Sequence, residues 1–145
     1  MSGRDDLRNA AGHAGVPALD AQLIRLYWCM RLGIGVIWLW TAYVSWFIFP
    51  HSQSVDWLRR IGIAGHADSA FAMLCVLDLL MGILSCVFAS ALLWWIQLLV
   101  VAGYSVVIAI LLPEFLFHPF GPIIKNLAVL CCLAFLGIVE RRRSL

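Results

Sequence analysis

The chain has 145 residues, of which 63% are hydrophobic and only 12% are charged, and its formal net charge is +2. Soluble domains carry about 25% charged residues, and a fold of this size could not bury so much apolar surface. The composition therefore excludes a water-soluble globular protein, and the small net charge gives no reason to expect nucleic-acid binding.

Long apolar runs predict a helical membrane protein. Only α-helices and closed barrels satisfy all backbone hydrogen bonds inside lipid, and barrel strands alternate apolar and polar residues, whereas these runs are continuously apolar. We therefore predict an all-α fold, a four-helix transmembrane bundle. The membrane domain covers residues 25–140, with spans at about 26–49, 69–89, 92–112 and 123–139.

The two ends of the chain predict its orientation. Residues 1–24 form a polar tail without the apolar core of a signal peptide, and residues 141–145 form a short basic tail. Four crossings place both tails on one side, with seven arginines there against Arg59, Arg60 and Lys125 on the other side. By the positive-inside rule, both termini are expected in the cytoplasm and the protein in the inner (plasma) membrane.

One face of the first span is expected to line the interior of the bundle. At helical spacing this stripe consists of Arg31, Gly35, Trp38, Ala42 and Ser45. Small and polar residues allow membrane helices to approach closely, so we predict that the stripe contacts other helices. The remaining faces of the span carry Leu32, Val36, Trp40, Tyr43 and Phe47.

The first connection, residues 50–68, contains the run VDWLRRIGI, which alternates apolar and charged residues at helical spacing. This pattern predicts an amphipathic turn or short helix on the membrane surface. His51 and His66 are interpreted as exposed loop residues, since their spacing matches no zinc pattern. The five cysteines form no Cys-x-x-Cys pair, and no haem, flavin or iron–sulfur motif is present, so no metal site and no resident cofactor is predicted.

The second span carries a carboxylate, Asp78, at its middle. A charge at the centre of a span costs at least about 2.5–3.5 kcal/mol, so we expect Asp78 to face other helices rather than lipid. Gly82, Ser85, Cys86 and Ser90 are predicted to share its face.

A buried polar cluster is the principal site hypothesis. Gln97 and Tyr104 lie seven residues apart on the third span and so share one face. We predict a cluster of Arg31, Asp78, Gln97 and Tyr104, with Arg31 reaching Asp78 directly, through Gln97 or through water. Such a cluster either locks the helices together or lets Asp78 exchange a proton or bind a ligand.

The segment PEFLFHPFGPIIKN, residues 113–126, leads into the fourth span and is stiffened by three prolines. Lys125 and Asn126 in the first turns of that span, together with His118, form a second candidate site. Lys125 either extends to the lipid headgroups or helps to bind an anion at the start of the helix. Glu114 is an alternative partner for Lys125.

Three segments resemble the DoxX-like family of small membrane proteins. HPFGPIIKNLAVL (118–130) is similar to the closing motif of the family, RLGIGVIWLWTAYV (31–44) to its first helix, and LDLLMG (77–82) to its acid-and-glycine segment. Asp78 stands where a glutamate is expected, and Ser45 and Trp46 replace a frequent lysine. The motif residues in the loop and helix start are His118, Pro119, Phe120, Gly121, Pro122, Lys125 and Asn126.

The resemblance implies a four-helix membrane bundle associated with membrane redox assemblies, since the family takes its name from a subunit of a thiosulfate:quinone oxidoreductase. It favours a non-catalytic accessory subunit in the lipid bilayer, next to a redox partner subunit, and a quinone is the one cofactor that it suggests. The alternatives are a small proton-coupled transporter that uses Asp78, and a structural or assembly partner. No catalytic residue and no oligomeric state is predicted.

Overall fold

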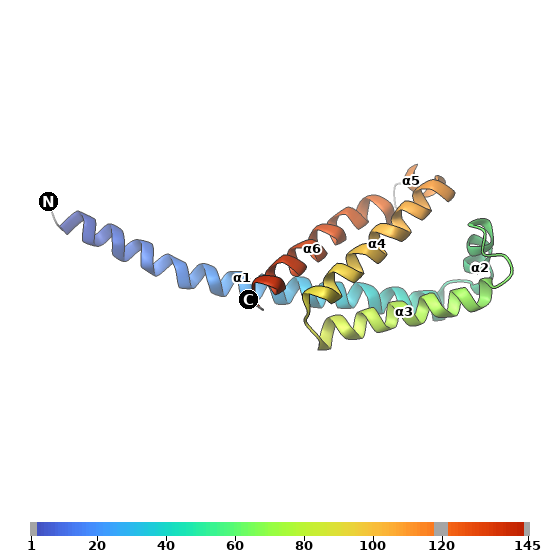
Figure 1. Ribbon diagram of the computed structural model, residues 1–145, viewed down its shortest axis with the longest axis horizontal. Coiled ribbons are helices and arrows are strands. Elements are labelled where there is room, and N and C mark those ends of the chain that lie inside the picture. The colour runs from blue at the N-terminus through green and yellow to red at the C-terminus, as the bar shows by residue number, and fades with distance from the viewer. Residues whose placement is uncertain (1–2, 118–121, 144–145) are drawn as a thin grey trace. The chain divides into compact units, whose positions relative to one another are not determined.

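The computed structural model describes residues 3–117 and 122–143, and within these ranges every regular element is a helix. The elements in chain order are α1 (Gly3–Tyr43), a π-helical segment η1 (Val44–Ile48), α2 (His51–Arg60), α3 (Ala67–Val87), α4 (Ala91–Leu111), α5 (Glu114–Phe117) and α6 (Pro122–Arg143), as labelled in Figure 1. The chain divides into a first part, Met1–Met30, and a second part, Arg31–Leu145. The first part is helical from Gly3 onward and so includes most of the predicted polar tail. The second part contains the packed helices.

Three stretches in the described residues are long and apolar enough to cross a membrane. They are Ala21–Ile48, Ala67–Val87 and Ala91–Leu111, which overlap the first three predicted spans. A chain with such helices is a membrane protein. The fourth predicted span coincides with helix α6.

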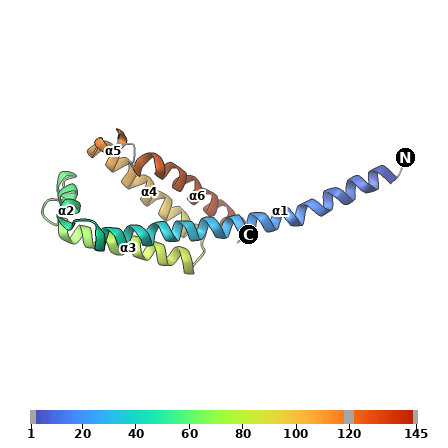
Figure 2. The same ribbon diagram turned by 180° about the vertical axis from the view of Figure 1, so that it is seen from behind.

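The second part of the chain contains two pairs of adjacent helices. Helix α4 lies beside α6, and α3 lies beside the part of α1 from Arg31 onward, as both views show (Figures 1 and 2). Two glycines allow α1 and α3 to approach closely. A Cβ atom on Gly35 would lie 2.6 Å from Cys86 Sγ, and one on Gly82 would lie 2.7 Å from Leu39 Cγ and 3.0 Å from the Leu39 backbone nitrogen.

The predicted interior stripe of the first span is confirmed. Arg31, Gly35, Trp38 and Ala42 are buried, and Ser45 is half-buried. The residues assigned to the other faces, Leu32, Val36, Trp40, Tyr43 and Phe47, are all exposed.

The face predicted for the second span is confirmed at Gly82 and Ser85, which are buried. Ser90 was misassigned to this face, because α3 ends at Val87. Ser90 is instead the N-cap of α4, where its hydroxyl accepts a hydrogen bond from the Leu93 backbone nitrogen at 3.2 Å.

The predicted amphipathic helix in the first connection is present as α2. Val55 and Leu58 on its apolar face are buried against Ala67, Phe71 and Cys75 of α3. His51 begins this helix rather than lying in a loop, and its Nε2 lies 2.9 Å from Asp68 Oδ1. Both side chains remain exposed.

Helix α2 also contacts α5. The Arg60 guanidinium donates a hydrogen bond to Glu114 Oε1 at 2.7 Å, and the ring of Trp57 meets that of Phe115 edge-on with centroids 5.4 Å apart. The partner of Glu114 is therefore Arg60, where the sequence suggested Lys125. These contacts join the two connections that leave α1 and α4.

The pKa of Glu114 is lowered, first by a hydrogen bond from its own backbone amide and then by the Arg60 guanidinium. A lowered pKa means that this interaction stabilises the fold above the ordinary pKa of glutamate and is lost as the pH falls through the lowered value. Replacing Arg60 by glutamine is expected to raise the pKa of Glu114 towards its ordinary range, as measured by NMR of ¹³C-labelled glutamate in micelles. Arg59→Gln is the matched control, because Arg59 pairs with Asp56 instead. An unchanged Glu114 titration in Arg60→Gln would contradict the assignment.

Candidate functional site

Arg31 binds the C-terminal end of α3. Its Nε donates to the Ser85 carbonyl oxygen at 2.7 Å, and its Nη2 donates to the Cys86 carbonyl oxygen at 2.9 Å. The last backbone bond of α3 runs from Phe88 to Leu84, so the carbonyls that follow Leu84 need donors from elsewhere. A cation at this end also offsets the negative end of the helix dipole.

Gln97 links three helices through its side-chain amide. It is fully buried, its Oε1 accepts from Trp38 Nε1 at 2.9 Å, and its Nε2 donates to Ser85 Oγ at 2.9 Å. Ser85 Oγ in turn donates to the Met81 carbonyl oxygen at 2.7 Å. Arg31, Trp38, Ser85 and Gln97 therefore form one buried network, here called the inter-helix network, which joins α1, α3 and α4.

Asp78 lies outside the inter-helix network, seven residues before Ser85 on α3, and its side chain is half-buried. Within the described part of the chain it has no hydrogen bond and no ion pair. Its carboxylate is close enough to Cys75 and to Tyr104 to interact electrostatically with both. Of the four residues in the predicted cluster, the structure thus joins Arg31 to Gln97 through Ser85, and it places Asp78 near Tyr104.

A second polar contact joins α4 and α6. Asn126 Nδ2 donates to Ser105 Oγ at 2.9 Å, and Ser105 Oγ donates to the Val101 carbonyl oxygen at 2.6 Å. The Tyr104 hydroxyl also lies near the Asn126 side chain. Tyr104, which is 38% exposed, is therefore near both Asp78 of α3 and Asn126 of α6.

The candidate anion site is only partly described. His118, Pro119, Phe120 and Gly121 lie outside the described residues, Pro122 begins α6, and Lys125 is exposed. Asn126, which the sequence grouped with Lys125, instead holds α6 against α4. An anion site at Lys125 stays a prediction.

Three contributors to these networks were missed from sequence: Trp38 as a hydrogen-bond donor, Ser85 as the central acceptor, and Ser105. The sequence did contain one indication of their role, because Trp38 and Ser85 both lie on helix faces predicted to be interior. In the described ranges no group of three or more histidine, cysteine or acidic side chains could hold a metal ion.

Comparison with known proteins places these residues within one family. The model of the DoxX-like family matches residues 35–134, which is more than half of the chain and includes Asp78, Ser85, Gln97, Tyr104 and Asn126. No curated protein and no solved structure matches the chain. The matched stretch covers the helix packing and both polar networks described above, with the exception of Arg31. The chain therefore belongs to the DoxX-like family.

Proposed function

We propose that the protein crosses the plasma membrane four times, with both termini in the cytoplasm. Helix α6 supports the fourth crossing, because its 22 residues at 1.5 Å each give about 33 Å, enough for a hydrocarbon layer of about 30 Å. The arginines Arg141, Arg142 and Arg143 in its last turn support the orientation.

Its role in this proposal is that of a non-catalytic subunit that anchors a partner in a membrane-associated oxidoreductase. The inter-helix network carries the proposal, because the buried polar groups of Arg31, Trp38, Ser85 and Gln97 hold helices together. A rigid membrane anchor requires such fixed helix contacts. The association with an oxidoreductase follows from the family name and from the resemblance of the DoxX-like motifs, and the partner would supply the redox cofactor or quinone site.

Purification in mild detergent tests this role. The tagged chain is expected to bring down one stoichiometric membrane or peripheral subunit whose absorption spectrum shows flavin, haem or iron–sulfur centres. The same tag on an unrelated four-span protein is the control for adventitious capture. Recovery of the chain alone, with normal quinone-dependent respiration in cells that lack it, would refute the role.

A second candidate function is a proton-coupled carrier, and Asp78 favours it. A half-buried carboxylate at the middle of a span, without hydrogen bond or ion pair in the described ranges, is costly for stability. Intramembrane acids of this kind commonly lie on proton or ion pathways. Tyr104 nearby offers a hydroxyl for proton exchange.

Proton flux into liposomes with an internal pH dye tests the carrier. When a gradient of the transported substrate is imposed across the liposome membrane, the wild-type chain is expected to move protons into the liposomes. Asp78→Asn is expected to abolish this proton flux. Asp56→Asn, on α2, is the matched control and should keep it. Absence of flux from the wild-type chain, or equal flux from Asp78→Asn, would exclude the carrier function.

A further inference from the structure

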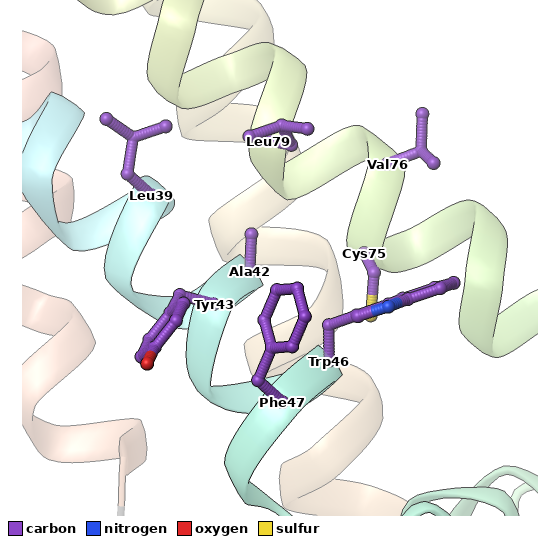
Figure 3. Close-up of a pocket in the computed structure, with 8 residues that line it drawn as sticks. All are labelled: Leu39, Ala42, Tyr43, Trp46, Phe47, Cys75, Val76 and Leu79. Carbon is purple, nitrogen blue, oxygen red and sulfur yellow. The ribbon is translucent and has the colours of Figure 1, made fainter.

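An apolar groove of about 370 Å³ lies between α1 with its π segment and α3 (Figure 3). One wall includes Leu39, Tyr43 and Phe47, and the other includes Cys75, Val76 and Leu79. Both walls belong to stretches that can cross a membrane, so the hydrocarbon of the bilayer borders the groove. Its volume lies within the range of about 300–1,000 Å³ that is typical of small-molecule sites.

The π segment shapes one wall of the groove. The Phe49 backbone nitrogen donates to the Val44 carbonyl oxygen at 2.8 Å, five residues back, which widens the last turn of this span. Figure 3 shows the Trp46 indole directed across to α3 and the Cys75 thiol directed towards Trp46. The Trp46 ring also stacks on Phe71, with centroids 6.2 Å apart and an interplanar angle of 12°. Single π turns within α-helices are frequent at functional sites.

Asp68 carries a carboxylate on the same stripe of α3 as two of the residues that line the groove, Cys75 and Leu79. Residues 68, 72, 75 and 79 follow one another at helical spacing, so they share one face of α3. On this face Asp68 is at the N-terminal end, which is the end nearer α2. The Asp68 side chain is 70% exposed and receives His51 Nε2 at 2.9 Å. His51 also meets Phe71 edge-on at 4.8 Å, so that Phe71 lies between the polar pair and Trp46.

We propose that the groove binds one acyl chain of an aminophospholipid, such as phosphatidylethanolamine, whose ammonium group pairs with Asp68. Leu79 follows Asp68 by eleven residues, or about 16 Å along the helix. This depth is close to half of the hydrocarbon layer of about 30 Å, and thus to the reach of one acyl chain from its headgroup. The cationic ammonium complements the charge of Asp68, and an anionic headgroup without an amine does not.

Native mass spectrometry tests the groove. The full chain in mild detergent is incubated with equal amounts of phosphatidylethanolamine and phosphatidylglycerol that carry the same acyl chains. Val76→Trp places an indole in the groove from a residue that is 51% exposed, so the fold should be kept. Val76→Trp is expected to reduce the amount of bound phosphatidylethanolamine about tenfold. A loss of this size corresponds to the apolar contact of only about two methylene groups of the acyl chain.

The matched control for the groove is Leu80→Trp, which adds the same indole to an exposed residue of α3 that does not line the groove. It should retain lipid as the wild-type chain does. Equal retention by the wild-type chain and by Val76→Trp would overturn the proposal. A wild-type dimer that Val76→Trp converts to a monomer would assign the groove to a second copy of the chain and would also overturn it.

The headgroup assignment has its own test. Asp68→Asn is expected to reduce the preference for phosphatidylethanolamine over phosphatidylglycerol about threefold, the scale of an exposed ion pair. His51→Gln keeps the carboxylate and should keep the preference. A wild-type chain that retains both lipids equally would overturn the pairing of the ammonium with Asp68.

Discussion

Replacing Arg31 by methionine is expected to lower the free energy of unfolding by about 2–4 kcal/mol, since hydrogen bonds to charged groups contribute about 1.5–3 kcal/mol each and those in membranes somewhat less. The guanidinium donates to the Ser85 and Cys86 carbonyl oxygens, and both would lose this donor. Methionine keeps most of the apolar volume of the side chain, so the loss reports the hydrogen bonds. Unfolding by a denaturing detergent, followed by circular dichroism, measures the change.

Two variants separate the contacts of Arg31 from its charge. Arg25→Met removes an exposed arginine six residues earlier and should change the stability little. Arg31→Lys keeps the charge but replaces the planar guanidinium, which binds two carbonyls at once, and is expected to fall between the wild type and Arg31→Met. Equal stability of Arg31→Met and Arg25→Met would contradict the role of Arg31 at the end of α3.

Gly82→Val is expected to destabilise the packing of α1 against α3 by about 1–3 kcal/mol, the usual cost of overpacking a close contact. Any Cβ at this position lies 3.0 Å from the Leu39 backbone nitrogen, which cannot move without moving α1. The branched valine adds two further methyl groups at the same place. The same detergent unfolding measures the loss.

Gly103→Val on α4 is the control for this substitution, because a Cβ on Gly103 meets nothing within 4 Å. It should be neutral or slightly stabilising, since valine is a better helix residue than glycine. A similar loss in both variants would show that valine disturbs these helices for reasons other than the contact between α1 and α3.

Helical periodicity in the sequence was enough to predict the packed face of α1. Gly35 and Ala42 are small enough for close helix contact, and the Arg31 charge would be too costly to expose to lipid. All three residues therefore indicate the same side of the helix as the packed face. The amphipathic helix α2 was predictable for the same reason, since Val55 and Leu58 recur at helical spacing among charged residues.

The partners within the polar networks were not predictable from residue type. Arg31 binds backbone carbonyl oxygens. Because every residue carries a backbone carbonyl, residue type cannot identify these partners, and the sequence points to an acidic side chain such as Asp78 instead. Ser85 is the link between Arg31 and Gln97, yet serine in a membrane helix serves either as a small packing residue or as a hydrogen-bonding residue, and the sequence does not distinguish the two roles. The partner of Asn126 on α4, Ser105, depends on how α4 and α6 are aligned, which periodicity does not determine.

The π segment Val44–Ile48 is a place where the first membrane helix can lose one residue without disturbing its packed face. A π turn holds one residue more than an α turn, so deletion of one residue there would restore ordinary helical bonding and leave the packed stripe of residues 31–42 in register. Deletion of one residue between 35 and 38 would instead rotate one side of the stripe against the other by about 100°. The additional residue is therefore dispensable for the fold, and what it provides is the placement of the Trp46 ring against Phe71 of α3.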